Sequence, residues 1–253
     1  MGSRLKPAAM YASVREYLLE LEESGVDGLP FEEEGQGSRV KGQGEITAEG
    51  PGSRVQGPGA TTLEELKLKW GDCRRCPLHK TRNSIVFGRG NPKSRIMFVG
   101  DAPGAEEDMQ GEPFVGEAGR ILTRIIEAMG LSRGEVYICN LVKCRPPEDR
   151  NPHRDEIEAC LPFLQQQIRA IGPEVIVALG TFASQSLLHN KEPISKLRGR
   201  FYEYSGIKLM PTFHPSFLLR HKNDRQIYWD VWDDMVKVLS MLKLPVPEKK
   251  RKE

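Results

Sequence analysis

The sequence has no apolar run of the roughly 18 to 20 residues that a membrane-spanning helix requires. Its first residues, MGSRLKPAAMYASVREYLLELEE, carry acidic side chains where a secretory signal would have its apolar stretch. Cysteine is scarce, with five in 253 residues and no regular spacing of a disulfide framework. We therefore expect a cytoplasmic protein whose thiols bind a metal or stay free.

Charge is distributed unevenly along the chain. Residues 1–60 hold 6 Lys or Arg against 10 Asp or Glu, a net charge of −4, which leaves +6 for the rest of a chain whose total is +2. The larger part is therefore the basic part. An excess of positive charge suits a polyanionic partner such as nucleic acid, but solvated basic faces are common, so charge alone leaves both interpretations open.

The first sixty residues differ in composition from the rest. Apolar spacing over 10–24 predicts an amphipathic helix. Residues 28–60 are rich in Gly, Ser, Gln and Pro and contain the repeat GQGSRVKGQG and GPGSRVQGPG. Such a segment buries too little apolar surface to offset its conformational entropy, so it predicts a flexible tether. We expect three parts: an N-terminal extension over 1–60, a main domain over 61–245 and a basic tail over 246–253.

Strands and helices alternate in the main domain. Thr62, with Glu65 three residues later, predicts a capped helix start. Four continuous apolar runs predict strands buried on both faces, at 95–100, 136–142, 174–180 and 207–213. Helical patterns lie at 117–129, 154–171, 181–189 and 224–242. The predicted fold is α/β, a three-layer α/β/α sandwich around a mainly parallel four-stranded sheet.

Polar residues follow three of these strands, at the edge where such sheets bind ligands. Asp101 stands in the loop GDAPG, after the first strand. Asn140 interrupts the second strand, where an unpaired amide would cost about 1 to 3 kcal/mol, so it either ties down a loop or reads the edge of a base. His214 opens HPSFLLR after the fourth strand and is either structural or catalytic.

Four further residues have both a structural and a functional interpretation. Phe114, framed by Pro and Gly, belongs either to the core or to a binding pocket. Ser216 could meet a phosphate, Leu218 could act as an apolar wedge, and Arg220 supplies a cation. A wedge, a phosphate contact and a histidine in one short segment suit an enzyme that extrudes a base from DNA.

The cysteines predict a metal site that joins distant segments. Four of them form a CRRC pair and two later positions, Cys73, Cys76, Cys144 and Cys160. These would ligate an iron–sulfur cluster, but CRRC followed by CPLH, with His79 as a further ligand, would also suit structural zinc. Spacing leaves the two metals open. Cys139 lies inside an apolar strand and is expected to be a buried free thiol.

Four sequence blocks resemble, in order, the signatures of family 4 uracil-DNA glycosylases, the thermostable-type enzymes with a 4Fe–4S cluster. They are CRRCPLHKTRN, VGDAPGAEEDMQGEPFVGEAGRIL, YICNLVKCRPPEDRNP and FHPSFLLR. The similarity covers about 61–243. It implies a DNA repair enzyme of base excision repair that hydrolyses the N-glycosidic bond of uracil in DNA and leaves an abasic site. It also implies that the four cysteines hold the cluster in a structural role.

The resemblance assigns roles to individual residues. Asp101 to Gly104 would face the sugar and water, with Asp101 catalytic and Ala102 and Gly104 binding substrate. Phe114 would stack on uracil and Asn140 would read its O4 and N3–H. His214 would stabilise negative charge at O2. Residues of the last block would contact DNA, namely Ser216, Leu218 and Arg220.

The chain departs from the family pattern at one position. The family has Glu where Asp101 stands, so the reach of this carboxylate changes while its charge is kept. Glu107 and Asp108 match the acidic pair of the family and are close enough in sequence to share its work.

Two other classes of function compete with the enzyme. A non-catalytic iron–sulfur protein of the same fold would bind DNA or damaged bases without cleaving them, and an iron–sulfur electron carrier would be reduced reversibly. We expect a monomer that acts on double- or single-stranded DNA. Residues 1–60 would either dock on the main domain or bind a repair or replication protein.

Overall fold

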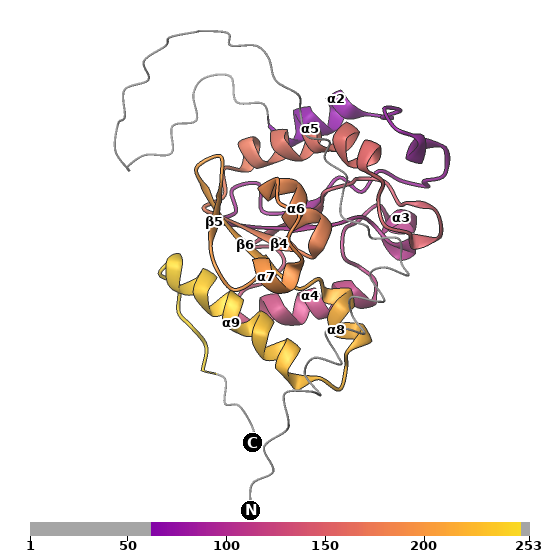
Figure 1. Ribbon diagram of the computed structural model, residues 1–253. Coiled ribbons are helices and arrows are strands. Elements are labelled where there is room, and N and C mark those ends of the chain that lie inside the picture. Colours follow the sequence, from indigo (N-terminus) through magenta and orange to yellow (C-terminus); the bar gives the residue numbers. More distant parts are fainter. Residues whose placement is uncertain (1–61, 249–253) are drawn as a thin grey trace, which may run out of the picture. The chain divides into compact units, whose positions relative to one another are not determined.

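The computed structural model describes residues 62–248, and Figure 1 shows how their helices and strands are arranged. The helix expected at 10–24, the tether at 28–60 and most of the basic tail lie outside the described residues. No helix within 62–248 combines the length and the apolar composition that a membrane-spanning helix requires.

Four parallel strands form the centre of the sheet, in the order β3-β2-β4-β6. Their bounds are Tyr137–Asn140 for β3, Ile96–Gly100 for β2, Val175–Leu179 for β4 and Ile207–Thr212 for β6. Every residue of β2, β3 and β4 is buried, as the continuous apolar runs predicted. The expected parallel four-stranded core is therefore confirmed.

Two short antiparallel strands extend the sheet to six and correct the expected strand number. β1 (Arg89–Gly90) pairs with β3, and β5 (Tyr202–Tyr204) pairs with β6. Neither carries an apolar run, because each lies at an edge and is partly exposed. Strands of two or three residues are also too short for a period-2 pattern to be visible in the sequence.

Helices cover both faces of the sheet and give the three expected layers. One face is covered by α2 (Leu63–Trp70), α5 (Arg154–Ile171) and α6 (Thr181–Leu188), which share one apolar cluster with Met97 and Val99. The other face is covered by four helices that share a second apolar cluster with Phe98. They are α4 (Glu117–Ala128), α7 (Ile194–Leu197), α8 (Pro215–Arg220) and α9 (Arg225–Met241). The alternation of Met97, Phe98 and Val99 between the clusters follows from the period of a strand.

The predicted start of α2 is confirmed in atomic detail. Glu65 donates its backbone N–H to Thr62 Oγ1 at 3.2 Å, and the N–H of Thr62 is accepted by Glu65 Oε2 at 2.8 Å. Leu66 and Trp70 of this helix are buried against the same cluster as α5. The helix therefore ends at a fixed position just before the CRRC segment.

Besides the edge strands and the helices α7 and α8, three short elements were not predicted from the sequence. They are α3 (Ala105–Gln110) and the 3-10 helices η1 (Pro77–Lys80) and η2 (Pro147–Asp149). The segment AEEDMQ of α3 has no apolar stripe, so no helical period marks it. Its first turn is capped by Glu107, whose Oε2 accepts the backbone N–H of the N-cap residue Gly104 at 3.1 Å.

Candidate active site

A pocket of ≈ 340 Å³ lies at the carboxyl ends of the parallel strands, where the loops after β2, β3 and β6 meet. The structure brings to its wall eight of the nine predicted substrate and DNA residues, which are Asp101, Ala102, Gly104, Phe114, Asn140, His214, Ser216 and Arg220. Leu218 is the exception. Strand ends far apart in the sequence converge here because the strands are parallel.

Asn140 ends β3 directly opposite Gly100 of β2 and is 1 % exposed. Its side-chain oxygen Oδ1 is buried and has no hydrogen-bond partner among the described residues. A buried amide oxygen without a donor costs about 1 to 3 kcal/mol. A Cβ at Gly100 would overlap both Asn140 Oδ1 and the ring of Phe114, so glycine is needed there. The arrangement provides an acceptor for a ligand N–H.

Phe114 is held in a backbone conformation that only a few per cent of non-glycine residues adopt, with a φ of 54°. Two contacts keep it there. A Cβ at Gly119 of α4 would overlap the carbonyl oxygen of Phe114, so the helix packs directly on this peptide. Arg133 donates from Nη2 to the carbonyl oxygen of Pro113 at 2.8 Å. The ring is thereby directed to the pocket, 5.7 Å from the ring of His214 between centroids.

Glu107 lines the pocket but is engaged with the backbone. Its Oε1 accepts the N–H groups of Val115 and Gly116, both at 2.9 Å, and its Oε2 accepts that of Gly104 at 3.1 Å. A carboxylate with three backbone donors has little capacity left for a sugar or a water. The expectation that it shares the work of Asp101 is therefore wrong; it joins the two loops that carry the pocket.

Asp108 is likewise structural and lies away from the pocket. It is 1 % exposed and accepts the N–H of Asn83 at 3.0 Å and of Ser84 at 3.2 Å. The amide Nδ2 of Asn83 also donates to it at 2.7 Å. These hydrogen bonds hold the segment that follows the first cysteine pair. Asp108 therefore does not share the work of Asp101 as expected, because its carboxylate is engaged outside the pocket.

His214 presents a defined proton to the pocket. Its Nδ1 accepts the backbone N–H of Ser216 at 3.1 Å and lies 2.8 Å from the Ser216 hydroxyl. Burial, together with the charge of Arg220, lowers the pKa of the imidazole to about 4, so the ring is neutral at pH 7. Since Nδ1 is an acceptor, the proton of the neutral ring is on Nε2. That Nε2 is buried and has no partner within residues 62–248.

Asp101 points its carboxyl group toward the start of α6. Oδ1 accepts the N–H of Ala183 at 2.7 Å and so caps a helix whose own N-cap, Gly180, has no side chain. Burial raises the pKa of Asp101 to about 7, against the opposing effect of the Ala183 N–H. A Cβ at Gly180 would stand 2.8 Å from Asp101 Oδ2 and 3.1 Å from His214 Cβ. Gly180, with a φ of 96°, is a site residue that sequence reasoning missed.

Leu218, which was expected to act as a wedge, lies in the apolar core and does not line the pocket. Its side chain is 0 % exposed and belongs to the apolar cluster between α4 and α9. In the helix α8 its position faces that cluster, whereas Ser216 and Arg220 lie on the pocket side.

The loop after β3 forms a wall of the pocket that was not foreseen. It contributes Arg150, whose guanidinium pairs with the buried carboxylate of Glu156 at 2.7 Å and 2.9 Å. The pair holds the loop against the start of α5. Arg150 stands within the block RPPEDRNP, where Pro and charge indicate a loop but give no role.

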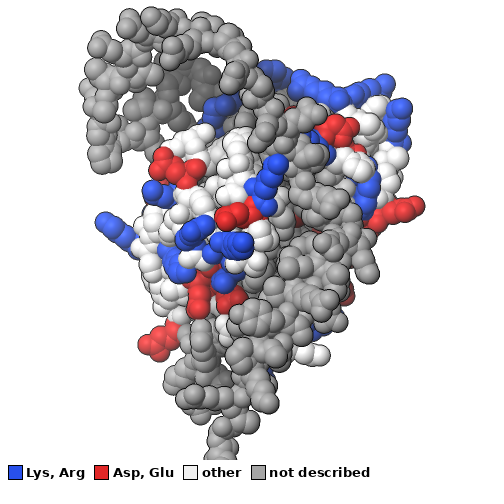
Figure 2. Space-filling view, viewed as in Figure 1, with Lys and Arg blue, Asp and Glu red and all other residues white. Residues whose placement is uncertain are grey.

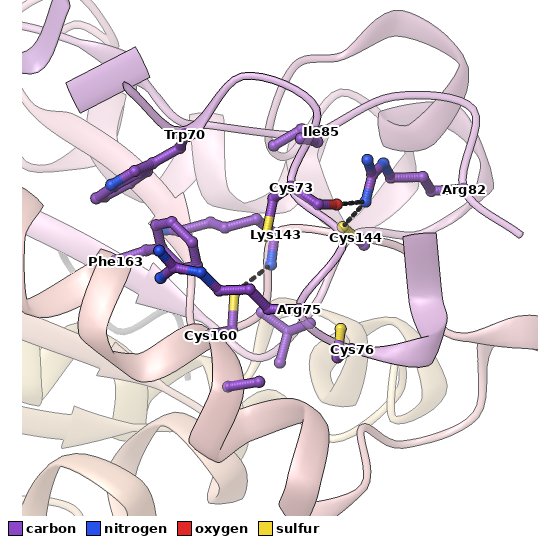
Figure 3. A pocket seen from close by; sticks show the side chains of 12 residues that line it. Trp70, Cys73, Arg75, Cys76, Arg82, Ile85, Lys143, Cys144, Cys160 and Phe163 are labelled. Atoms are coloured by element: carbon purple, nitrogen blue, oxygen red, sulfur yellow. Dashed lines mark hydrogen bonds between the residues drawn. The ribbon is translucent and has the colours of Figure 1, made fainter. Parts of the chain in front are cut away.

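The four predicted cysteines line one cavity, shown in Figure 3, together with the apolar side chains of Trp70, Ile85 and Phe163. Arg82 donates from Nη1 to Cys144 Sγ at 3.4 Å, and the backbone N–H of Lys143 donates to Cys160 Sγ at 3.3 Å. Cys139 is buried in β3 outside this cavity, as expected. His79 is also outside it and bonds the Cys76 carbonyl.

The donor set of this cavity fits an iron–sulfur cluster. Four thiols from three segments face a shared space, and N–H groups point at two of the sulfurs, which is a usual surrounding of cluster thiolates. Within residues 62–248, no three His, Cys, Asp or Glu side chains converge on a point where one metal ion would sit. The zinc alternative that used His79 has no support from the position of that ring.

The pocket and the sheet lie within a region that matches the family profile described as the uracil DNA glycosylase superfamily, residues 87–236. The match covers every pocket residue named above and two of the four cysteines. The chain belongs to this superfamily.

Its similarity to curated proteins is more specific. It is 47% identical over 173 residues to the type-4 uracil-DNA glycosylase of Thermotoga maritima, covering 68% of this chain and 90% of that protein. It is 47% identical over 164 residues to that of Saccharolobus solfataricus, covering 61% and 76%. For Archaeoglobus fulgidus the identity is 42% over 175 residues, covering 66% and 88%. Within the superfamily, the chain is therefore a member of the type-4 uracil-DNA glycosylases.

Proposed function

We propose that this chain hydrolyses the N-glycosidic bond between uracil and deoxyribose in DNA, releasing free uracil and leaving an abasic site. The observation that carries the proposal is a pair of buried polar atoms, His214 Nε2 and Asn140 Oδ1, which have no partner among residues 62–248 and lie on the wall of one pocket. One donates and the other accepts. Family membership points to the same activity.

The pocket matches the edge of uracil better than that of cytosine. Uracil carries an N–H at N3 and a carbonyl at O4, which pair with the oxygen and the NH₂ of one Asn side chain. Cytosine has an acceptor at N3 and an amino group at C4, so both contacts with Asn140 would be mismatched and a buried acceptor left unpaired. That mismatch costs about 1 to 3 kcal/mol. Phe114 supplies the aromatic face on which the extruded base stacks.

The chemistry follows from where charge develops. As the bond between C1′ and N1 breaks, the electron pair stays on uracil, chiefly on its oxygens, and the sugar becomes cationic. His214 donates its Nε2–H to O2 and stabilises the leaving anion as a neutral donor; one such contact is worth about 2.7 to 4 kcal/mol. A water oxygen then bonds to C1′, and the proton that this water loses passes through Asp101 and finally neutralises the released uracil anion.

Asp101 is proposed to act in its ionised form near the sugar. A carboxylate at the strand end stabilises the cationic sugar and accepts the proton of the attacking water. Its Oδ1 is occupied by the Ala183 N–H, which leaves Oδ2 for this work. The pKa of about 7 means that the ionised fraction changes strongly across neutral pH.

Cys73, Cys76, Cys144 and Cys160 are proposed to hold a 4Fe–4S cluster. When bound, the cluster supplies a rigid cross-link among three segments rather than a reacting group. The thiols lie outside the uracil pocket, because the two cavities share no lining residue.

DNA is proposed to approach at the rim of the uracil pocket. Ser216 and Arg220 at the pocket rim supply a hydroxyl and a cation for phosphate. Figure 2 shows Lys and Arg side chains gathered along α2 and the segment that follows it, where the exposed basic residues are Lys67, Lys69, Arg74, Arg75 and Lys80. This basic edge suits a polyanion.

The test is a single-turnover assay with an oligonucleotide that contains one uracil, against the same strand with thymine. Purified iron-loaded protein is expected to release free uracil and to leave an alkali-labile site only in the first strand. Asn140→Ala and His214→Ala should each lower the rate about 100-fold or more while keeping the visible absorbance. Binding without product would support the non-catalytic rival instead.

A further inference from the structure

Lys143 is a buried lysine between the two cavities. It is 3 % exposed, and it follows Asn140 by three residues in the turn after β3. No carboxylate of residues 62–248 forms an ion pair with its ammonium group. Burying an ammonium without a counter-charge is costly, so such a residue is expected to have a defined use.

The ammonium group holds the peptide of the uracil-reading residue. Lys143 Nζ donates to the backbone carbonyl oxygen of Asn140 at 2.6 Å, a short charge-assisted hydrogen bond. The next two peptides are fixed from the other side, because Leu141 and Val142 donate their N–H groups to the carbonyl oxygens of Gly100 and Asp101 at 2.7 Å and 3.0 Å. The orientation of Asn140 thus depends on this turn.

The same residue belongs to the cysteine cavity. Lys143 lines it, and its backbone N–H donates to Cys160 Sγ at 3.3 Å, as Figure 3 shows. A 4Fe–4S cluster with four thiolate ligands carries net negative charge, which would supply the counter-charge that the surrounding side chains lack. One residue therefore contacts a cluster ligand through its backbone and the uracil reader through its side chain.

We propose that Lys143 is a positioning residue that transmits the presence of the cluster to uracil recognition. Its ammonium group, balanced by the cluster, fixes the peptide of Asn140 and hence the amide that reads the base. The proposal rests on the proposed function. In this proposal the cluster affects uracil binding through the orientation of Asn140, in addition to stabilising the fold as a whole.

The test compares iron-loaded Lys143→Met with wild type in binding rather than turnover. Two duplexes are used, one with uncleavable 2′-fluoro-2′-deoxyuridine and one with a tetrahydrofuran abasic analogue at the same position. The ratio of their dissociation constants isolates recognition of the base. Lys143→Met is expected to lose about tenfold of the preference for the uracil analogue, with abasic binding unchanged.

Arg82→Met is the matched control, because Arg82 also contacts the cysteine cavity but has no contact with Asn140. Iron is expected to be released faster to a chelator from this variant, whereas its iron-loaded fraction should keep the wild-type binding ratio. Lys143→Arg, which keeps the charge, should recover most of the ratio, and it provides the test if Lys143→Met does not fold.

The outcomes separate this proposal from the proposed function. Wild type that binds both duplexes equally and releases no uracil would overturn the function. If wild type releases uracil and Lys143→Met has the same ratio of dissociation constants as wild type, the proposed role of Lys143 is wrong. An equal loss in Arg82→Met, or no recovery in Lys143→Arg, would also overturn it, since either result would mean a general effect of the cavity.

Discussion

Burial of Asp101 opposes the ionised form that its two roles favour. Capping α6 and the proposed stabilisation of a cationic sugar both favour the carboxylate, yet burial raises the pKa of this group to about 7. Its Oδ1 lies 2.7 Å from the backbone nitrogen of Ala183, so the carboxyl group stays close to the start of α6. The residue therefore ties the reactivity of the pocket to pH.

We expect kcat/KM for uracil release to rise from pH 6 to pH 8 as Asp101 ionises. In Asp101→Asn the rate should be lower by about 10- to 100-fold and nearly independent of pH over that range. Single-turnover rates measured across this range test the expectation. A wild-type profile that stays flat would contradict the assigned role, whatever the rate of the variant.

The stability of the fold should also depend on the ionisation of Asp101, but it should fall as pH rises, whereas the activity should increase. Because the folded pKa of Asp101 lies above the ordinary value of 3.8, the folded state favours the protonated form, and this group's contribution to stability falls as pH rises from about 4 to about 7. Relative to wild type, Asp101→Asn should therefore gain roughly 2 kcal/mol in unfolding free energy between pH 5 and pH 8. Urea denaturation at both pH values measures it. An unchanged difference between the two proteins would contradict the burial of this carboxyl.

The helix α4 is placed by contact between two backbones. Its residue Gly119 lies against the carbonyl of Phe114, so the start of the helix and the strained peptide determine each other. The helix also covers Phe98 and the other members of its cluster. The apolar stripe of α4 predicts the extent of the helix. The contact of Gly119, in contrast, depends on the path of the loop that carries Phe114, and the stripe contains no information about that path.

Gly119→Ala should destabilise the protein by about 1 to 3 kcal/mol, because the added Cβ overlaps the Phe114 peptide. Helix propensity alone predicts the opposite, a gain of about 1 kcal/mol. Gly134→Ala is the control, since its Cβ would meet only Ser132 Oγ at 3.8 Å. Thermal unfolding of both variants distinguishes the effects, and a stabilised Gly119→Ala would contradict the packing described.

The sequence predicted those elements that bury apolar side chains in the core. The parallel strands and the long helices bury apolar residues at fixed periods, and the resemblance of motif blocks assigned the pocket residues around them. The edge strand β5, the helix α3 and the burial of Leu218 could not be predicted in this way. They depend on hydrogen bonds and packing partners that are distant in sequence, such as the backbone N–H groups of Asn83 and Ser84 that donate to Asp108 of α3.

The molecule as a whole joins a rigid sheet to a cysteine cavity on one of its faces. That cavity draws on the end of α2, the turn after β3 and α5. None of these segments contributes a reacting group, yet the turn after β3 also carries Asn140. Loss of the metal should therefore damage folding and binding before it changes the bond-breaking step.

Cys76→Ser is expected to lower iron content and to reduce the melting temperature by several degrees, because one ligand of the cross-link is lost. Binding of uracil-containing DNA should weaken as well. The single-turnover rate of the molecules that still bind should fall by less than about tenfold. Iron analysis, thermal unfolding and rate measurements at saturating protein test these three statements, and a rate loss without a binding loss would contradict them.

The contact of Asp101, Gly180 and His214 has an evolutionary consequence. These residues come from the ends of three different strands, and no side chain larger than a hydrogen atom fits at the middle position without moving the other two. A lengthened acid at position 101 or a side chain at position 180 would be tolerated only together with a compensating change. The three positions should therefore show epistasis in a mutational scan, so that in related genes they change as a set or not at all.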